Sequence, residues 1–288
     1  MIDLYGASTY NSNIKRAKGV FAMNNLTLIT GACGGLGKAF CVECAVLGHD
    51  LIVTDLHEDS LKKLASSLSS TYGIRVVPFA CNLTDLAQRQ ALFQKVGELK
   101  SELFMAINVA GLDFEGEIES LSSQMISAVI RLNTEATLDI TRFASALFHK
   151  KDFYIINVAS MAGFFSMPLK AMYAASKRAI IQFSLAVREE IKERGGHVMA
   201  LCPSGLRTMP QVIASIDSQG LAGRITTIET GTVAHNAIKR AKLGKAKYIP
   251  GVLNLILVSF SSIVPESIKT KLIYKRWKAT RSKVAQDI

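Results

Sequence analysis

Tyr173 and Lys177 lie four residues apart in the stretch Tyr173-Ala-Ala-Ser-Lys177, where a helix is predicted to begin. Residues spaced by four project from one face of a helix, so the phenol and the ammonium would be neighbours. An ammonium stabilises a phenolate, and we therefore expect the pKa of Tyr173 to be lowered from about 10. Such a phenol can take a proton from an alcohol or give one to a carbonyl. Ser160, at the end of a predicted strand, is placed to hold the oxygen of that substrate.

A second group of residues follows the first predicted strand. From Thr30 to Gly37 the chain reads Thr-Gly-Ala-Cys-Gly-Gly-Leu-Gly and then enters a predicted helix. Glycines permit a tight turn and a close approach of the backbone to a ligand. The first turn of the helix offers free N–H groups and a partial positive charge to a phosphate. Between a first strand and a first helix, this pattern predicts binding of the pyrophosphate of a dinucleotide.

Asp55 ends the second predicted strand, 18 positions after Gly37. A carboxylate there can accept hydrogen bonds from both hydroxyls of an adenosine ribose, and it would repel a 2′-phosphate. Neither neighbouring residue is basic, so the sequence favours NAD over NADP as the cofactor. The alternative is that Asp55 caps the following helix, although Asp59 and Ser60 are available for that role.

Short β-branched runs alternate with longer helical patterns, which is typical of a parallel sheet covered by helices on both faces. The predicted strands are Leu26–Thr30, Leu51–Asp55, Val76–Ala80, Phe104–Val109, Tyr154–Ala159, Val198–Cys202 and one near Tyr248. The predicted helices span 35–48, 58–71, 85–100, 122–149, 171–194 and 230–243. We therefore predict an α/β fold, a single doubly wound Rossmann-type domain with a mostly parallel, seven-stranded sheet.

The sequence predicts that the chain consists of three parts. Residues 1–24 are an N-terminal extension, 25–250 a dinucleotide-binding catalytic domain, and 251–288 an appended segment that is first apolar and then basic. Within the catalytic domain, residues 204–229 form a long apolar connection after the sixth strand. Loops of this length in a compact domain are usually functional and often act as lids, so we expect this one to face the substrate.

Taken together, these motifs resemble the classical type of the short-chain dehydrogenase/reductase family, over roughly residues 25–250. The family's T-G-x-x-x-G-x-G turn matches at Thr30, Gly31, Gly35 and Gly37, and its catalytic Asn, Ser, Tyr and Lys match Asn133, Ser160, Tyr173 and Lys177. The resemblance implies an oxidoreductase that moves hydride between NAD(H) and a carbonyl or secondary alcohol, working as a homo-oligomer. It also implies that Asn133 holds a water in a proton relay from Lys177, and that Lys177 binds the nicotinamide ribose.

The resemblance also carries over cofactor-binding positions beyond the glycine turn. They are Leu36, Asp55, Asn82, Leu83, Asn108, Ala110, Gly111, Tyr173, Lys177, Pro203 and Thr208. Three places depart from the family pattern. Asn82 replaces the usual Asp near the adenine, Val109 replaces the second Asn of N-N-A-G, and Ser204 replaces the first Gly of P-G-x-x-x-T. None of these changes removes a catalytic group.

The segments expected to line the substrate site are apolar. Together with Ser160, the candidate substrate-binding residues are Phe164, Phe165, Met167 and Met209. They favour a hydrophobic secondary alcohol or ketone, such as a hydroxysteroid or another lipid-like compound. An equally weighted alternative is that half of them only pack a loop against the body. Two other functions stay open: a 3-oxoacyl-thioester reductase that uses NADPH, and a dinucleotide-binding sensor or scaffold without turnover.

The net charge of +11 is concentrated at the C-terminal end. Residues 239–288 contain 12 Lys and Arg against two acids, while residues 1–238 are nearly neutral. A uniformly basic nucleic-acid surface is therefore not expected. The basic tail has three interpretations: a solvated helix that closes the site or contacts another subunit, a contact with anionic lipid, or a contact with an acidic substrate carrier.

The cysteines and the apolar runs bear on cellular location. Five scattered cysteines, an odd number, suit a reducing compartment, and Cys41-x-x-Cys44 has no second pair at metal-ligand spacing. The N-terminus has no secretory pattern, and the longest apolar run, at about 251–264, is too short to span a bilayer. We therefore expect a cytoplasmic protein with no bound metal and no membrane span.

Overall fold

The computed structural model describes residues 25–99, 103–147, 152–206, 228–261 and 263–284, with side chains described up to Lys278. Within these ranges, seven strands form one parallel sheet in the order β3-β2-β1-β4-β5-β6-β7. The strands are β1 (Leu26–Thr30), β2 (Leu51–Asp55), β3 (Val76–Ala80), β4 (Leu103–Asn108), β5 (Phe153–Val158), β6 (Gly196–Leu201) and β7 (Lys247–Tyr248). The predicted doubly wound, Rossmann-type fold is confirmed.

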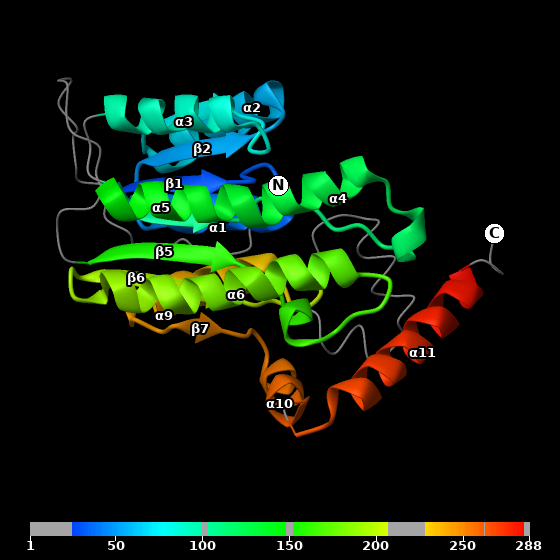
Figure 1. Cartoon of the computed structure of the whole chain (residues 1–288). Helices are drawn as coiled ribbons and strands as arrows, with labels where there is room; N and C mark the ends of the chain where they lie inside the picture. The colour runs from blue at the N-terminus through cyan, green and yellow to red at the C-terminus, as the bar shows by residue number, and fades with distance from the viewer. Residues whose placement is uncertain (1–24, 100–102, 148–151, 207–227, 262, 285–288) are drawn as a thin grey trace.

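Helices cover both faces of the sheet (Figure 1). One layer contains α1 (Gly35–Val46), α2 (Glu58–Tyr72) and α9 (Thr230–Lys242), whose buried side chains share one apolar cluster with the sheet. The other layer contains α3 (Leu86–Glu98), α5 (Thr137–Leu147) and α6 (Ala171–Lys192), which contribute to a second cluster. Because the central strands are buried on both faces, they are almost continuously apolar, and this made them recognisable in the sequence.

The order of the strands determines where a ligand can bind. The chain adds β2 and β3 on one side of β1 and then crosses to place β4 on the other side. The connections that leave β1 and β4 at their carboxyl ends therefore run in opposite directions, and a crevice opens between them. Thr30 and Asn108 are the last residues of these two strands, and they are paired in the sheet.

The predicted helix 122–149 is interrupted in the structure. It consists of α4 (Ser123–Val129), the π-helical turn η2 (Ile130–Ala136) and α5, and Asn133 lies within η2. π-Helical turns widen the backbone spiral and often occur at functional sites. The apolar periodicity gave no sign of this interruption, since a single π turn only shifts the register of the helix that follows.

The appended C-terminal segment forms two helices, α10 (Val252–Ser261) in its apolar part and α11 (Glu266–Val284) in its basic part. Both lie outside the two helical layers, α10 at the bottom and α11 at the lower right of Figure 1. Two short 3-10 turns, η1 (Ile118–Ser120) and η3 (Met161–Phe164), complete the described elements. In the described ranges, no helix is long and apolar enough to cross a membrane.

Candidate active site

The glycine turn between β1 and α1 is packed so closely that side chains are excluded at two positions. Gly31 has φ +63°, and a Cβ there would lie 2.8 Å from the backbone nitrogen of Ala110. A Cβ on Gly37 would lie only 2.0 Å from the carbonyl oxygen of Gly31. Glycine is required at 31 for its left-handed backbone, and at 37 because the first turn of α1 touches the preceding loop.

The N-terminus of α1 fits the pyrophosphate of a dinucleotide. Its N-cap is Gly34, which has no side chain to satisfy the free N–H groups of the first turn. Twelve helical residues follow, so a partial positive charge is present at this end. The predicted cofactor residues Gly35 and Leu36 belong to this first turn. The exposed amides and the closely approached backbone are what an anionic diphosphate needs.

Replacing Gly37 by alanine should abolish dinucleotide binding and lower the stability, because the new methyl group would meet backbone atoms that cannot move aside independently. We expect a loss of unfolding free energy of about 1–3 kcal/mol, typical of overpacking. Gly97→Ala is the matched control, since a Cβ on this α3 residue meets nothing within 4 Å. Thermal unfolding and a fluorescence titration with NADH check both variants; normal binding by Gly37→Ala would show that the turn does not hold the cofactor.

Asp55 contacts the glycine turn directly. Its Oδ2 accepts a hydrogen bond from the backbone N–H of Cys33 at 2.8 Å, and its Oδ1 accepts one from Leu56 at 2.7 Å. The residue that caps α2 is His57, without a side-chain hydrogen bond, so the alternative of Asp55 as the helix cap is not what the structure shows. A carboxylate can accept about four hydrogen bonds, which leaves two positions for ribose hydroxyls.

Thr30 and Asn108 connect the ends of β1 and β4 to their surroundings. The Thr30 hydroxyl accepts hydrogen bonds from the backbone N–H groups of Val109 (3.1 Å) and Ala110 (3.2 Å), fixing the turn after β4 against the glycine turn. Asn108 is buried, and its amide donates to the Asn157 side chain at 2.8 Å. Both residues therefore fix the ends of the strands that border the crevice between β1 and β4.

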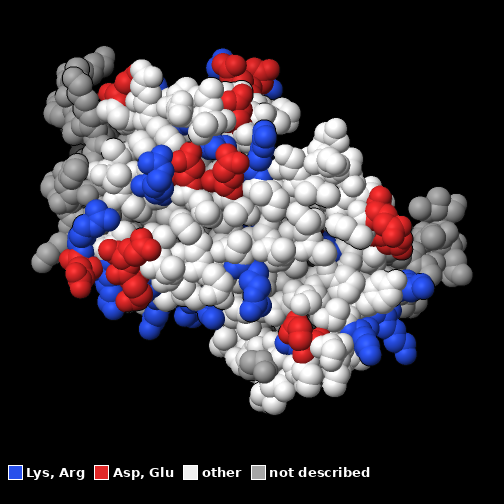
Figure 2. All heavy atoms as spheres, viewed as in Figure 1, with Lys and Arg blue, Asp and Glu red and all other residues white. Residues whose placement is uncertain are grey.

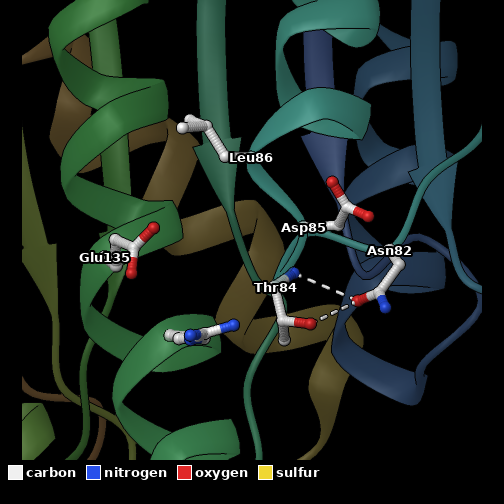
Figure 3. Close-up of a pocket in the computed structure, with 6 residues that line it drawn as sticks. Asn82, Thr84, Asp85, Leu86 and Glu135 are labelled. Atoms are coloured by element: carbon white, nitrogen blue, oxygen red, sulfur yellow. Dashed lines mark hydrogen bonds between the residues drawn. The ribbon is translucent and has the colours of Figure 1, made fainter.

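Asn82 and Leu83 lie on the turn that joins β3 to α3. The Asn82 Oδ1 accepts hydrogen bonds from both the backbone and the hydroxyl of Thr84, as Figure 3 shows. An open pocket of about 470 Å³ lies beside this turn, with Glu135 on its opposite side. The Asn82 oxygen is therefore used within the turn, and only the N–H groups of its side-chain amide are left for an adenine.

Arg89 ties this turn to the helix that carries Asn133. Its side chain is 1% exposed, and it donates to the carbonyl of Leu83 at 2.7 Å. It also forms ion pairs with Glu135 of η2 and, at 3.1 Å, with Asp139 of α5. An arginine can satisfy three acceptors at once because its five N–H donors form a planar fork. The position of the candidate cofactor turn thus depends on a buried residue of α3 that the sequence analysis did not single out.

Asn133 is completely buried and fully hydrogen bonded in η2. Its amide donates to the carbonyl of Leu112 at 2.8 Å and to the Ser176 hydroxyl at 3.0 Å, while its Oδ1 accepts from Leu112 N–H at 2.7 Å. The side chain therefore fixes the backbone that follows Gly111. Both amide donors are already used, so the relay water suggested by the resemblance has no donor from this side chain.

Gly111 is the place where Asn133 and Lys177 meet. A Cβ on Gly111 would lie 3.2 Å from Asn133 Oδ1 and 3.2 Å from Lys177 Nζ. The missing side chain thus leaves room for the ammonium beside the end of β4. The buried Lys177 ammonium also donates to the carbonyl of Val158, at the end of β5, at 2.9 Å.

Tyr173, Ser160 and Lys177 converge at the carboxyl ends of β4 and β5. Ser160 caps η3 by accepting from Ala162 N–H at 3.1 Å, which orients its hydroxyl toward Tyr173 and the Pro203 carbonyl. Lys177 Nζ lies 5.7 Å from the centre of the Tyr173 ring. The three predicted residues are therefore brought together by the start of α6 and the turn after β5.

The protonation of this group differs from the expectation. Although part of the Tyr173 surface is exposed, burial of the phenol raises its pKa to about 12, and a hydrogen bond with Ser160 only partly offsets this. Burial likewise lowers the pKa of Lys177 to about 8. The expected lowering of the Tyr173 pKa by the ammonium is therefore not found, because removing either group from water disfavours its charged form. A further positive charge placed beside the phenol would favour its ionised form.

The candidate substrate residues are placed less uniformly. Phe164 packs against a buried cluster behind the site, and Lys247 lies 5.1 Å from the centre of its ring. This favours the alternative that Phe164 packs the turn against the body. Phe165 and Met167 are partly buried on the same segment. Thr208 and Met209 lie outside the described residues. The described residues on either side of them, Leu206 and Ile228, form an isolated parallel β-bridge.

A buried polar network beneath the site was missed by the sequence analysis. Asn157 of β5 accepts from Asn108 and from Thr141 of α5, and it donates to Ser184 of α6 at 3.0 Å. The network links two strands to the two helices that hold Asn133 and Tyr173. Hydrogen-bonded networks of this kind rigidify a core, although the buried Oδ1 of Asn108 has no partner among the described residues. The only available signal was polar residues at positions where periodicity predicts burial.

Comparison with known proteins gives relatives named as reductases. The very-long-chain 3-oxoacyl-CoA reductase of Phaeosphaeria nodorum is 28% identical over 179 residues, which are 60% of this chain and 52% of that protein. The 3-oxoacyl-acyl-carrier-protein reductase FabG of Thermotoga maritima is 28% identical over 182 residues, 63% of this chain and 74% of that protein. The chain therefore matches about half the length of the first relative.

A solved structure and a family model agree with the fold. The structure of a 7beta-hydroxysteroid dehydrogenase superposes with a TM-score of 0.78 at 23% identity, covering 87% of this chain and 97% of the other. At that identity the likeness concerns the fold alone. The family model described as short chain dehydrogenase matches residues 25–215, well over half of the chain, and includes the glycine turn, Asn133, Ser160, Tyr173 and Lys177. The chain belongs to the short-chain dehydrogenase family.

Proposed function

We propose that the protein is an NAD(H)-dependent oxidoreductase that interconverts a hydrophobic secondary alcohol and its ketone. The observation that carries this proposal is the convergence of Tyr173, Ser160 and Lys177 beside the glycine turn. When bound, the dinucleotide would supply or accept the hydride, and its oxidised nicotinamide would add a positive charge beside the phenol.

In this mechanism the protein's own residues handle the substrate oxygen and its proton. Ser160 holds the oxygen through its hydroxyl, whose orientation is set by Ala162 and Pro203. Tyr173 gives the proton to the carbonyl oxygen during reduction and takes it back during oxidation. Lys177 favours the phenolate electrostatically, and its position is fixed by the carbonyl of Val158. Asn133 fixes the backbone of Leu112 through two hydrogen bonds, and the preceding residue, Gly111, lies beside the Lys177 ammonium.

The substrate class is tested by a screen of steroid, acyl-thioester and simple alcohol or ketone substrates with each cofactor, followed by the absorbance of the reduced cofactor. We expect turnover with an apolar secondary alcohol or ketone and a preference for NAD(H). Turnover confined to 3-oxoacyl thioesters with NADPH would establish the second candidate instead. That candidate is favoured by the names of the two relatives described above, which are 3-oxoacyl reductases.

Asp55 should determine which cofactor is preferred. In Asp55→Asn the ribose hydroxyls lose a charged acceptor, and the repulsion of a 2′-phosphate is removed. Hydrogen bonds to charged groups contribute about 1.5–3 kcal/mol, so kcat/KM for NADH should fall about tenfold to hundredfold relative to that for NADPH. Asp59→Asn, an exposed carboxylate in the first turn of α2, is the control and should leave the ratio unchanged. An unchanged ratio in Asp55→Asn would show that Asp55 does not determine which cofactor is preferred.

A third candidate function is a sensor or scaffold that binds the dinucleotide without turnover. The presence of Asn133, Ser160, Tyr173 and Lys177 argues against it, because binding alone needs the glycine turn but not the phenol. We also propose, on family resemblance alone, a homo-oligomer formed through the 122–149 and 171–194 helices. A cytoplasmic location remains our expectation, and the five cysteines are unpaired in the structure.

A further inference from the structure

The C-terminal arm, residues 252–284, carries more exposed large hydrophobic residues than all the other described parts of the chain together. Of the twenty large hydrophobic residues that are exposed in the described ranges, eleven lie in this arm. They are Val252, Leu253, Leu255, Ile256, Leu257, Phe260, Ile263, Val264, Ile268, Leu272 and Tyr274. Single exposed hydrophobic residues are ordinary on a protein surface, but a contiguous group marks an interaction site.

The same arm is strongly basic. Its residues include seven Lys and Arg and one acid, Glu266. Figure 2 shows basic side chains gathered at the lower right, where Figure 1 places α11, with an uncharged surface beside them over α10. Ile268 and Leu272 are one helical turn apart, so both project from the side of α11 that Lys271 and Lys275 flank.

The arm is attached to the segments that border the active site. Glu266 accepts hydrogen bonds from the hydroxyl (2.7 Å) and the backbone N–H (3.2 Å) of Ser166, seven residues before Tyr173. Lys170 lies 5.2 Å from the centre of the Trp277 ring. At the other end of the arm, the Asn254 side-chain amide donates a hydrogen bond to the Ser204 hydroxyl at 2.8 Å. Ser204 lies three residues after the end of β6. Polar anchors thus hold the arm beside the candidate site while its apolar side chains remain exposed.

We infer that the C-terminal arm binds the surface of an anionic lipid membrane and holds the candidate active site beside it. An apolar helix next to a cluster of cations matches the two layers of such a surface, the acyl boundary and the negative headgroups. In the described ranges no helix can span a bilayer, so the arm would lie on the membrane. A second copy of the chain is a poorer partner, because it would bring the same positive charge to the contact.

This inference extends the proposed function in one respect, since it supplies the route of an apolar substrate. A lipid-like alcohol or ketone is concentrated in the membrane, and the arm would place the segment of Ser166 and Lys170, which precedes Tyr173, at that boundary. The binding itself does not depend on catalysis. Flotation of the protein with vesicles therefore tests the inference even if the substrate class proves different.

The test is flotation of the full chain with vesicles of phosphatidylcholine alone or with phosphatidylserine, at low and high salt. We expect flotation with the anionic vesicles at low salt and weaker flotation at high salt, since salt screens the charges. Lys271→Glu/Lys275→Glu should bind at least about tenfold less, because each cation near an anionic surface contributes about 1 kcal/mol. Ile256→Ser/Phe260→Ser, which replaces two exposed side chains of α10, should also weaken binding.

Matched controls change the same properties elsewhere on the surface. Lys239→Glu/Lys245→Glu carries the same charge reversal on and after α9, and Leu56→Ser/Leu243→Ser removes two exposed apolar side chains outside the arm. Both should float like the unchanged protein. Equal losses in the controls, or no flotation with anionic vesicles at low salt, would overturn the inference. Light scattering that shows the arm variants turning a dimer into a monomer, without flotation of the original, would assign the surface to a second copy.

Discussion

Tyr173→Phe should reduce turnover by about 10²- to 10⁴-fold while leaving dinucleotide binding intact. General acid–base catalysis by a positioned side chain contributes rate factors of this size. The substitution keeps the aromatic ring and removes only the hydroxyl that is hydrogen bonded to Ser160. Steady-state kinetics with a substrate found in the screen measures the first effect, and a fluorescence titration with NADH measures the second.

Tyr72→Phe is the matched control for this prediction. Tyr72 is the last residue of α2, its side chain is 37% exposed, and its phenol lies away from the candidate site. Its loss should leave both turnover and binding unchanged. Full turnover by Tyr173→Phe would exclude the phenol as the proton donor. It would also leave the chain with a dinucleotide site but no identified acid or base.

Arg89→Met should have the largest effect on stability. The substitution keeps an unbranched side chain of similar length but leaves Asp139 and the Leu83 carbonyl without their buried donor. Removing one partner of a buried ion pair costs about 3–5 kcal/mol, and we expect about 3 because Glu135 is half exposed and can turn to water. Affinity for the dinucleotide should fall as well, since the turn carrying Asn82 and Leu83 loses its attachment to η2.

Arg142→Met is the matched control, because it removes an exposed arginine instead of a buried one. Arg142 binds the same carboxylate, Asp139, at 2.9 Å, but its side chain is 71% exposed. Exposed ion pairs contribute little, so we expect a change within about 1 kcal/mol. Urea unfolding measures both variants. A similar small change for Arg89→Met would mean that its buried ion pairs make no net contribution to the fold.

Much of the fold follows from short-range patterns in the sequence. The bounds of β1, β2 and β3 agree with the predicted strands, because apolar, β-branched runs of five residues are bounded by polar turns. The glycine turn was recognisable for a related reason. Gly31 has a left-handed backbone that favours glycine, and Gly37 is packed so closely against the preceding loop that a Cβ does not fit, so the glycine spacing itself indicates the turn.

Features that depend on distant parts of the chain were not predictable in the same way. Arg89 is in a helix with ordinary surface composition, and its buried contacts with Glu135 and Asp139 come from residues about 50 positions away in the chain. The Asn157 network requires four elements to meet at one point. The pKa of Tyr173 also depends on burial. A spacing of four residues predicted the neighbouring ammonium, but it could not weigh that charge against the loss of water.

The C-terminal segment is intermediate between these two cases. Its composition, apolar and then basic, was plain in the sequence, and three interpretations of it were left open. What the structure adds is the exposure of the apolar residues and the contacts of Glu266 and Trp277 with the segment before Tyr173. Those two observations favour a lipid surface, because a helix that only closed the site would have buried its apolar side.

On the proposed mechanism, the buried phenol of Tyr173 becomes an effective acid or base when positive charge is placed beside it. The direct test is a pH titration of tyrosinate absorbance, as the difference between the unchanged protein and Tyr173→Phe, with and without oxidised NAD. Without the dinucleotide, Tyr173 should ionise only near its raised pKa of about 12. With NAD the ionisation should move to clearly lower pH, because a nearby cation favours the phenolate. Identical titrations under both conditions would contradict the account.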